Sequence, residues 1–231
     1  MKPFRTLAET RTPDGSRLTL HEHDGEYFMK LNGRQLMSTS STASEVLLAH
    51  EACASLRGLP NISVLIGGLG LGFTLKRVLE LVRPGSVVEV AELLEEVVQW
   101  NRDLLKPVNG KLLLDHRVKV LIADVFTVIK RAGHAYYDAI MLDVDNGPTS
   151  FVHSKNSRIY NRRGLGLIYH ALKPGGRVAF WSAVEEPDFP GHLKRAGFSV
   201  EVLPAKAHER ARQWPHRIYV AERAAAPAGR T

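Results

Sequence analysis

Cysteine is almost absent from this chain, which has a single one, Cys53, in 231 residues. A lone cysteine cannot close a disulfide within the chain, and its apolar surroundings favour a buried structural thiol. Long apolar runs are also missing, because charged residues interrupt each run well before the roughly 20 residues that span a bilayer. The N-terminal residues lack the apolar core of a secretion signal. We therefore expect a cytoplasmic protein with no membrane partner.

Motifs for metal or nucleic-acid binding are scarce as well. His21 and His23 would share one face of a strand, but no third ligand is evident, so we expect no metal. The net charge is +7, from 31 Lys and Arg against 24 Asp and Glu. Neither a zinc-finger spacing nor an aromatic RNA-binding signature accompanies this charge, so a nucleic-acid partner is disfavoured.

The chain instead shows an ordered series of strand and helix patterns. Asp24-Gly25 and Asn32-Gly33 predict tight hairpins in a small N-terminal β-meander, and Thr42 with Glu45 predicts a capping box at the next helix. Beyond it, short β-branched runs alternate with helical stretches, which predicts a doubly wound α/β fold with a mostly parallel sheet. The predicted units are a β-rich subdomain, a linking helix, an α/β domain and a flexible tail, at residues 1–40, 41–60, 61–223 and 224–231.

The sharpest motif is the glycine-rich run Gly67-Gly68-Leu69-Gly70-Leu71-Gly72. It lies between a predicted strand and a predicted helix, which is the context that supports a nucleotide-binding loop. Glycines there let the backbone turn tightly and approach a ligand. The run fits an S-adenosylmethionine loop better than an NAD loop. We therefore assign Gly67, Gly68, Gly70 and Gly72 to cofactor binding on a Rossmann-like fold of the S-adenosylmethionine-dependent methyltransferase type.

Two acids follow the next two predicted strands. Glu92, twenty residues after Gly72, can accept both ribose hydroxyls of a nucleoside, and Asp124 suits the amino group of adenine. The alternative is that both acids only cap helices, since acids favour helix N-termini. Because the loop and both acids fall at the carboxyl ends of successive strands, where open α/β sheets bind ligands, we favour the nucleotide site.

These residues together resemble the spermidine synthase family, whose members transfer an aminopropyl group from decarboxylated S-adenosylmethionine to an amine. The resemblance extends over nearly the whole chain, including residues 137–148, where a strand ends in two acids before a Gly-Pro pair. It implies that Asp143 is the catalytic acid, with Asp145 beside it. It also implies a divergent family member in polyamine biosynthesis, with a small-molecule amine acceptor and a homodimeric assembly.

Carboxylates suit this chemistry because a cationic amine must lose a proton before it can attack the carbon next to the sulfonium. A second acid nearby would raise the pKa of one of the two. Residues 145–148 also fit a simple turn, which makes Asp145 the more structural acid. Gly70 stands where the family carries an acid that is expected to contact the donor, so the donor is either decarboxylated or intact S-adenosylmethionine. Glu45 is a loose match to an amine-pocket residue.

Three functions therefore stay open. The first is aminopropyl transfer with Asp143 as general base, and the second is methyl transfer from S-adenosylmethionine. The third is nucleotide or nucleic-acid binding without catalysis. The loop-like residues 151–153 and 158–160 are further predicted to form a mobile lid over the acceptor site.

Overall fold

The computed structural model describes residues 4–144 and 157–225 of the chain, which contain two sheets. Four antiparallel strands follow one another at the N-terminus: β1 (Arg5–Arg11), β2 (Arg17–His23), β3 (Glu26–Leu31) and β4 (Arg34–Ser38). Asp24 and Asn32, each with a φ of 49°, adopt the left-handed conformation that Asp-Gly and Asn-Gly hairpins require. The predicted N-terminal β-meander is confirmed.

The second sheet has seven strands in the order β10-β11-β9-β8-β5-β6-β7. They are β5 (Ser63–Gly67), β6 (Val87–Glu92), β7 (Val118–Ile122), β8 (Tyr137–Leu142), β9 (Leu172–Ser182), β10 (Phe198–Ala205) and β11 (His216–Arg223). Strands β5 to β9 pair in parallel, whereas β11 runs antiparallel to β9 and β10. The predicted doubly wound, mostly parallel fold is confirmed. Its strand order reverses between β5 and β8, the kind of position where open α/β sheets bind ligands.

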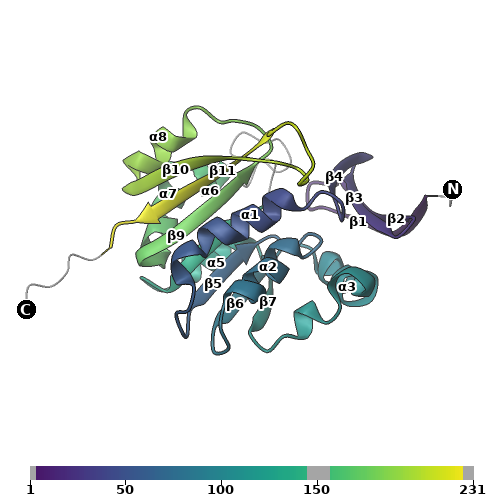
Figure 1. Cartoon of the computed structure of the whole chain (residues 1–231), viewed down its shortest axis with the longest axis horizontal. Coiled ribbons are helices and arrows are strands. Elements are labelled where there is room, and N and C mark those ends of the chain that lie inside the picture. Colours follow the sequence, from purple (N-terminus) through teal and green to yellow (C-terminus); the bar gives the residue numbers. More distant parts are fainter. Residues whose placement is uncertain (1–3, 145–156, 226–231) are drawn as a thin grey trace, which may run out of the picture.

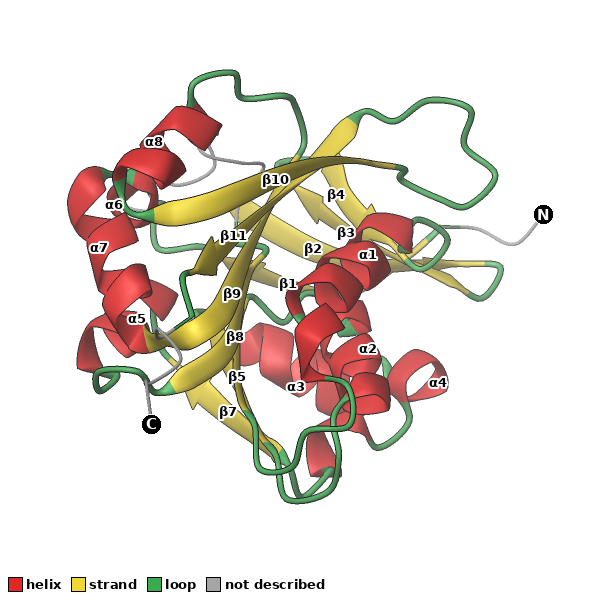
Figure 2. Ribbon diagram, turned by 60° about the vertical axis from the view of Figure 1, so that its left-hand side comes forward, coloured by secondary structure: helices red, strands yellow, loops and turns green. Residues whose placement is uncertain are grey.

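Helices cover both faces of the seven-stranded sheet (Figure 2). One face carries α1 (Ala43–Ala52), α2 (Phe73–Leu81), α3 (Glu95–Asp103) and the short α4 (Lys106–Asn109). The other carries α5 (Val125–Arg131), α6 (Ser157–Tyr160), α7 (Arg162–Ala171) and α8 (Phe189–Arg195). Two 3-10 turns, η1 (Ala54–Leu56) and η2 (Leu112–Leu114), complete the elements of the described residues.

The small N-terminal sheet packs on the first of these layers and not on a core of its own (Figure 1). Leu20 of β2 and Met29 of β3 belong to the same buried cluster as Leu48 of α1 and Val64 of β5. Leu20, Leu48 and Val64 are fully buried, which contributes about 1.5–3 kcal/mol for each side chain. This shared core fixes the N-terminal sheet beside the glycine loop.

Two local predictions near α1 have opposite outcomes. Cys53 is 1% exposed and burial raises the pKa of its thiol to about 12, which confirms a structural cysteine. The capping box is wrong, because the Thr42 side chain makes no capping hydrogen bond. Glu45 instead accepts a hydrogen bond of 2.7 Å from the Ser44 hydroxyl. None of the helices in the described parts of the chain is both long enough and apolar enough to cross a membrane.

Candidate active site

The glycine loop turns sharply at the end of β5 and lies against the end of β8. Gly68 has a φ of 91°, and a Cβ atom there would come within 2.6 Å of the backbone carbonyl oxygen of Asp143. Gly70 has a φ of 51°, and its Cβ would come within 2.8 Å of the Met37 sulfur. Both positions therefore favour glycine for backbone conformation, and Gly68 also for space, because its neighbour is a backbone atom whereas the Met37 thioether can move. Gly67 ends β5, and Gly72 directly precedes α2.

Two asparagines that the sequence did not single out hold this loop from outside. The Asn101 amide, on α3, donates to the Gly70 carbonyl at 2.8 Å. The Asn109 amide, on α4, donates to the Leu71 carbonyl at 2.7 Å and to the Asn101 side-chain oxygen at 2.8 Å. Asn101 is 3% exposed, so its bonds form in a low-dielectric setting where they are strong.

Glu92 lies where predicted, at the end of β6 and beside the glycine loop. Its carboxylate accepts hydrogen bonds of 2.9 Å from the backbone N–H groups of Leu69 and Leu94. Glu92 is only 8% exposed, and burial raises its pKa while the backbone N–H groups oppose that rise. The backbone N–H groups of Leu93 and Gly70 also interact with this carboxylate, so the loop backbone fixes its orientation.

Asp124 has two partners, one for each carboxylate oxygen. One oxygen accepts from the Phe126 backbone N–H at 2.7 Å and caps α5, as the alternative interpretation held. The other accepts from the Arg158 guanidinium at 2.6 Å. The Arg158 guanidinium also lies over the Phe126 ring, 4.8 Å from its centre. Capping and a role in the site are therefore compatible, because Asp124 lines the same cavity as Glu92.

The described residues give the predicted lid no support. Residues 151–153, like Asp145, lie outside them. Residues 158–160 are not loop-like, because they belong to α6. Ile159 is fully buried, and the Tyr160 ring packs against Phe180 and Phe189 with ring centres 5.9 and 5.7 Å away. For this half of the segment the prediction is wrong, since its apolar side chains bury themselves on the sheet.

Asp143 directly follows β8, and its backbone N–H donates to the Gly67 carbonyl at 3.1 Å. Its carboxyl makes no hydrogen bond or ion pair within the described part of the chain. Burial, and secondarily the charge of Glu45, raise the pKa of Asp143 to about 8. Burial also raises the pKa of Glu45, which the Ser44 hydroxyl partly opposes. Two acids with raised pKa values therefore face each other beside the glycine loop.

Two adjoining cavities bring the predicted residues together. One of about 190 Å³ is lined by Glu92, Asp124, Asp143 and the loop glycines 68 and 70. The other, of about 20 Å³, is lined by Glu45, Asp143 and residues 68–74. A larger cavity of about 820 Å³ opens between α6, α7 and α8, but none of the predicted site residues lines it. The predicted site residues therefore gather at the first two cavities and not at the largest one.

A pair of aromatic residues beside Asp143 was not predicted. Leu142 pairs with Phe180, so the next residues, Asp143 and Trp181, are neighbours at the carboxyl edge of the sheet. The Trp181 and His216 rings lie 4.9 Å apart, and burial lowers the pKa of His216. Trp181 Nε1 and His216 Nδ1 are buried without a hydrogen-bond partner in the described structure. Such unpaired groups are unfavourable unless a ligand or water meets them.

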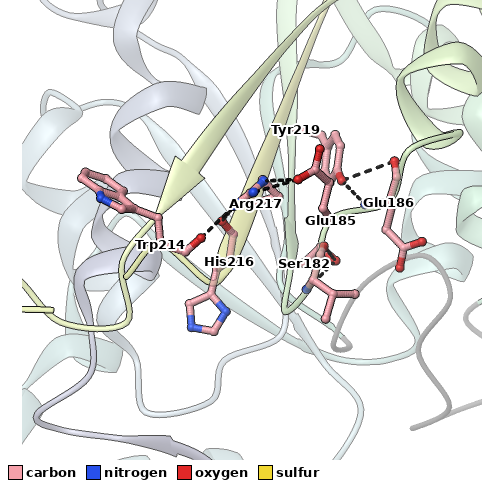
Figure 3. A network of polar contacts seen from close by, with 8 residues as sticks. Ser182, Glu185, Glu186, Trp214, His216, Arg217 and Tyr219 are labelled. Carbon is pink, nitrogen blue, oxygen red and sulfur yellow. Dashed lines mark hydrogen bonds and ion pairs between the residues drawn. The ribbon is translucent and has the colours of Figure 1, made fainter. Parts of the chain in front are cut away.

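The residues around this pair are held by a polar network at the start of β11 (Figure 3). Arg217 reaches Glu185 at 2.7 Å and the Trp214 carbonyl at 2.8 Å, while the His216 ring points away from that network. The Ser182 hydroxyl donates to the Val184 carbonyl at 2.7 Å. Nothing in the sequence paired Trp181 with His216, and neither residue lines the two cavities that Asp143 lines.

Comparison with known proteins places the chain among its relatives. A family model described as a spermine/spermidine synthase domain matches residues 42–187, which is more than half of the chain. The chain belongs to this family. The matched range contains the glycine loop, Glu92, Asp124 and Asp143, so the resemblance predicted from those residues is confirmed.

Solved spermidine synthase structures share the fold. One in complex with the transition-state analogue AdoDATO has a TM-score of 0.75 and 20% identity, covering 96% of this chain and 75% of that one. Spermidine synthase from Thermotoga maritima has a TM-score of 0.72 and 18% identity, covering 96% and 74%. These values confirm the Rossmann-like fold of the methyltransferase type.

Curated relatives include two kinds of transferase. A polyamine aminopropyltransferase of Oceanobacillus iheyensis is 27% identical over 165 residues, 70% of this chain and 31% of that protein. Polyamine aminopropyltransferase 1 of Streptomyces coelicolor is 29% identical over 166 residues, which are 71% of this chain and 29% of that protein. Putrescine N-methyltransferase 1 of Nicotiana tabacum is 32% identical over 128 residues, which are 53% of this chain and 31% of that protein. The chain spans about a third of the length of these relatives.

Proposed function

We propose that this protein is an aminopropyltransferase, which moves the aminopropyl group of decarboxylated S-adenosylmethionine to a small amine. The observation that carries the proposal is Asp143, a largely buried carboxyl with a pKa of about 8 at the wall of the cavity that Glu92 and Asp124 also line. A general base is most effective when its pKa lies near the working pH. Family membership and the names of the aminopropyltransferase relatives support the same reaction.

The donor nucleoside would occupy the cavity of about 190 Å³. Glu92 would accept its ribose hydroxyls, because the N–H groups of Leu69 and Leu94 already fix the direction of this carboxylate. Asp124 would accept the adenine amino group with the lone pairs that Phe126 and Arg158 leave open. The loop glycines would let the backbone approach the donor closely.

In the reaction, the acceptor nitrogen attacks the propyl carbon bonded to the sulfonium. The carbon–sulfur bond breaks, its electron pair returns to sulfur, and methylthioadenosine leaves. The proton of the acceptor nitrogen passes to the Asp143 carboxylate. A bound cation favours the ionised form of a neighbouring acid, so substrate binding would lower the pKa of Asp143 and prepare it as the base.

The acceptor would lie on the side of Asp143 that Trp181 and His216 form. The unpaired Trp181 N–H and His216 Nδ1 offer one donor and one hydrogen-bonding ring nitrogen to an amine or to its water. Putrescine, which the name of the tobacco relative contains, is the first acceptor to test. Asp145 as a second acid and a homodimeric assembly are further proposals, and the assembly is testable by light scattering of the purified protein.

The deciding experiment incubates the purified protein with putrescine and either decarboxylated or intact S-adenosylmethionine, and identifies the products by mass spectrometry. We expect spermidine and methylthioadenosine from the decarboxylated donor, and loss of at least 99% of the rate in Asp143→Asn. The exposed Asp103→Asn is the matched control and should keep the rate. Methylated putrescine from the intact donor, or full activity in Asp143→Asn, would overturn the proposal.

A further inference from the structure

The smaller cavity has the composition of a site for one cation. Its volume of about 20 Å³ has room for a single water-sized group, such as water or an ammonium. Glu45 reaches it from the first turn of α1, and Asp143 reaches it from the end of β8. The other lining residues are Met37 and the run 68–74, so no Lys, Arg or His contributes to its wall.

The two acids lack a cationic partner within the described residues. Glu45 has the Ser44 hydroxyl as its side-chain partner, and Asp143 has none. The other interaction of Glu45 is with its own backbone N–H in the first turn of α1. Burying acids without a cation is unfavourable, and a ligand that carries a positive charge removes that penalty.

The position of this cavity beside the cavity of about 190 Å³, where the donor nucleoside would lie, indicates which cation it binds. Met37, Gly68, Gly70 and Asp143 line both cavities, so the two are separated by a shared wall. Gly70 has no side chain there, and the Met37 sulfur occupies the space beside its Cα. A nucleoside in the larger cavity could therefore extend a short side chain past Gly70 toward Glu45 once the flexible Met37 thioether moves aside.

We propose that Glu45 binds the terminal ammonium of the aminopropyl chain of the donor, and so selects decarboxylated over intact S-adenosylmethionine. This inference rests on the proposed function. Intact S-adenosylmethionine carries a carboxylate on the same chain, which would face the acids Glu45 and Asp143 and be repelled. Asp143 remains the base for the acceptor, on the wall between the two cavities.

The test measures binding by calorimetry with three nucleosides that share the adenosyl group and differ in the chain on sulfur. S-adenosyl-3-thiopropylamine carries the ammonium alone, S-adenosylhomocysteine carries ammonium and carboxylate, and methylthioadenosine carries neither. We expect the wild-type protein to bind the propylamine at least tenfold more tightly than S-adenosylhomocysteine. Glu45→Gln should weaken the propylamine at least tenfold and leave methylthioadenosine within twofold, which also shows that the variant is folded.

Glu51→Gln is the matched control, because Glu51 lies on the same helix, pairs with His50 at 3.0 Å and lines neither cavity. It should leave all three affinities unchanged. Unchanged propylamine binding in Glu45→Gln, or equal weakening of all three ligands, would overturn the inference. So would an effect confined to the KM of putrescine, which would assign the acid to the acceptor. Failure of wild-type protein to bind methylthioadenosine would instead overturn the proposed function itself, and the inference with it.

Discussion

Replacing Asp143 by asparagine should stabilise the folded protein at high pH, in addition to abolishing activity. Burial, with the charge of Glu45, raises the pKa of Asp143 from an ordinary 3.8 to about 8. Between these pH values the folded state binds more protons than the unfolded state, so stability falls as pH rises and the loss is complete above about pH 8. At 1.36 kcal/mol for each pKa unit, the upper limit of this loss is about 6 kcal/mol.

The effect that we expect is smaller than that limit. Glu45 titrates with Asp143, and the pair faces cavities that water can enter, so about 2 kcal/mol is a realistic gain for Asp143→Asn at pH 9. Below pH 4 both proteins carry a neutral group at this position and should differ by less than about 1 kcal/mol. Urea unfolding at pH 4 and pH 9, followed by circular dichroism, measures the difference.

The contrast between the two pH values is what tests the reasoning. The exposed Asp103→Asn should show no such contrast, since its side chain is 66% accessible. An equal stability change at both pH values in Asp143→Asn would refute the claim that burial of the charge is responsible. So would destabilisation at pH 9, which would mean that the carboxylate has a stabilising partner in the folded state.

Three further substitutions test the rest of the site. Glu92→Ala should weaken methylthioadenosine binding at least tenfold in calorimetry, because it removes the proposed acceptor for the ribose and the partner of two backbone N–H groups. Asn101→Ala should lower the free energy of unfolding by about 1–3 kcal/mol in urea, since it leaves the Gly70 carbonyl unpaired; an unchanged midpoint would contradict this. Trp181→Phe keeps the ring beside His216 and removes its N–H, so steady-state assays should show a raised KM for putrescine with unchanged methylthioadenosine affinity. A change in donor affinity alone would place Trp181 elsewhere.

That the residues of the proposed nucleoside site lie together was predictable from the sequence, because their placement follows rules of sheet topology. Gly67, Glu92 and Asp143 each end or directly follow a parallel strand, and parallel strands present their carboxyl ends at one edge. The strand patterns therefore placed these residues together before any coordinates were needed. Asp124 followed for the same reason, although its pairing with Arg158 did not, because no local pattern links residues so far apart.

The remainder of the site depends on contacts between distant segments. Trp181 and His216 meet only because β11 returns antiparallel to β9, between β9 and β10. Met37 reaches Gly70 because the N-terminal sheet shares the core of the main domain. Glu45 matched the capping-box pattern with Thr42. In the structure Thr42 makes no capping hydrogen bond, and the packing of α1 places Glu45 at the wall of the small cavity. Tertiary packing decided each of these cases.

The hydrogen bonds of Asn101 and Asn109 to the glycine loop affect the thermodynamics of donor binding. Asn101 and Asn109 hold the loop carbonyls from α3 and α4 through hydrogen bonds within the protein, so we expect the loop to keep its bend with or without a nucleoside. Association with such a preorganised site forfeits little chain entropy, and the binding energy goes into affinity instead of into ordering the backbone. The glycines allow the bend of this loop, and the side-chain amides of Asn101 and Asn109 stabilise it by hydrogen bonds to the loop carbonyls.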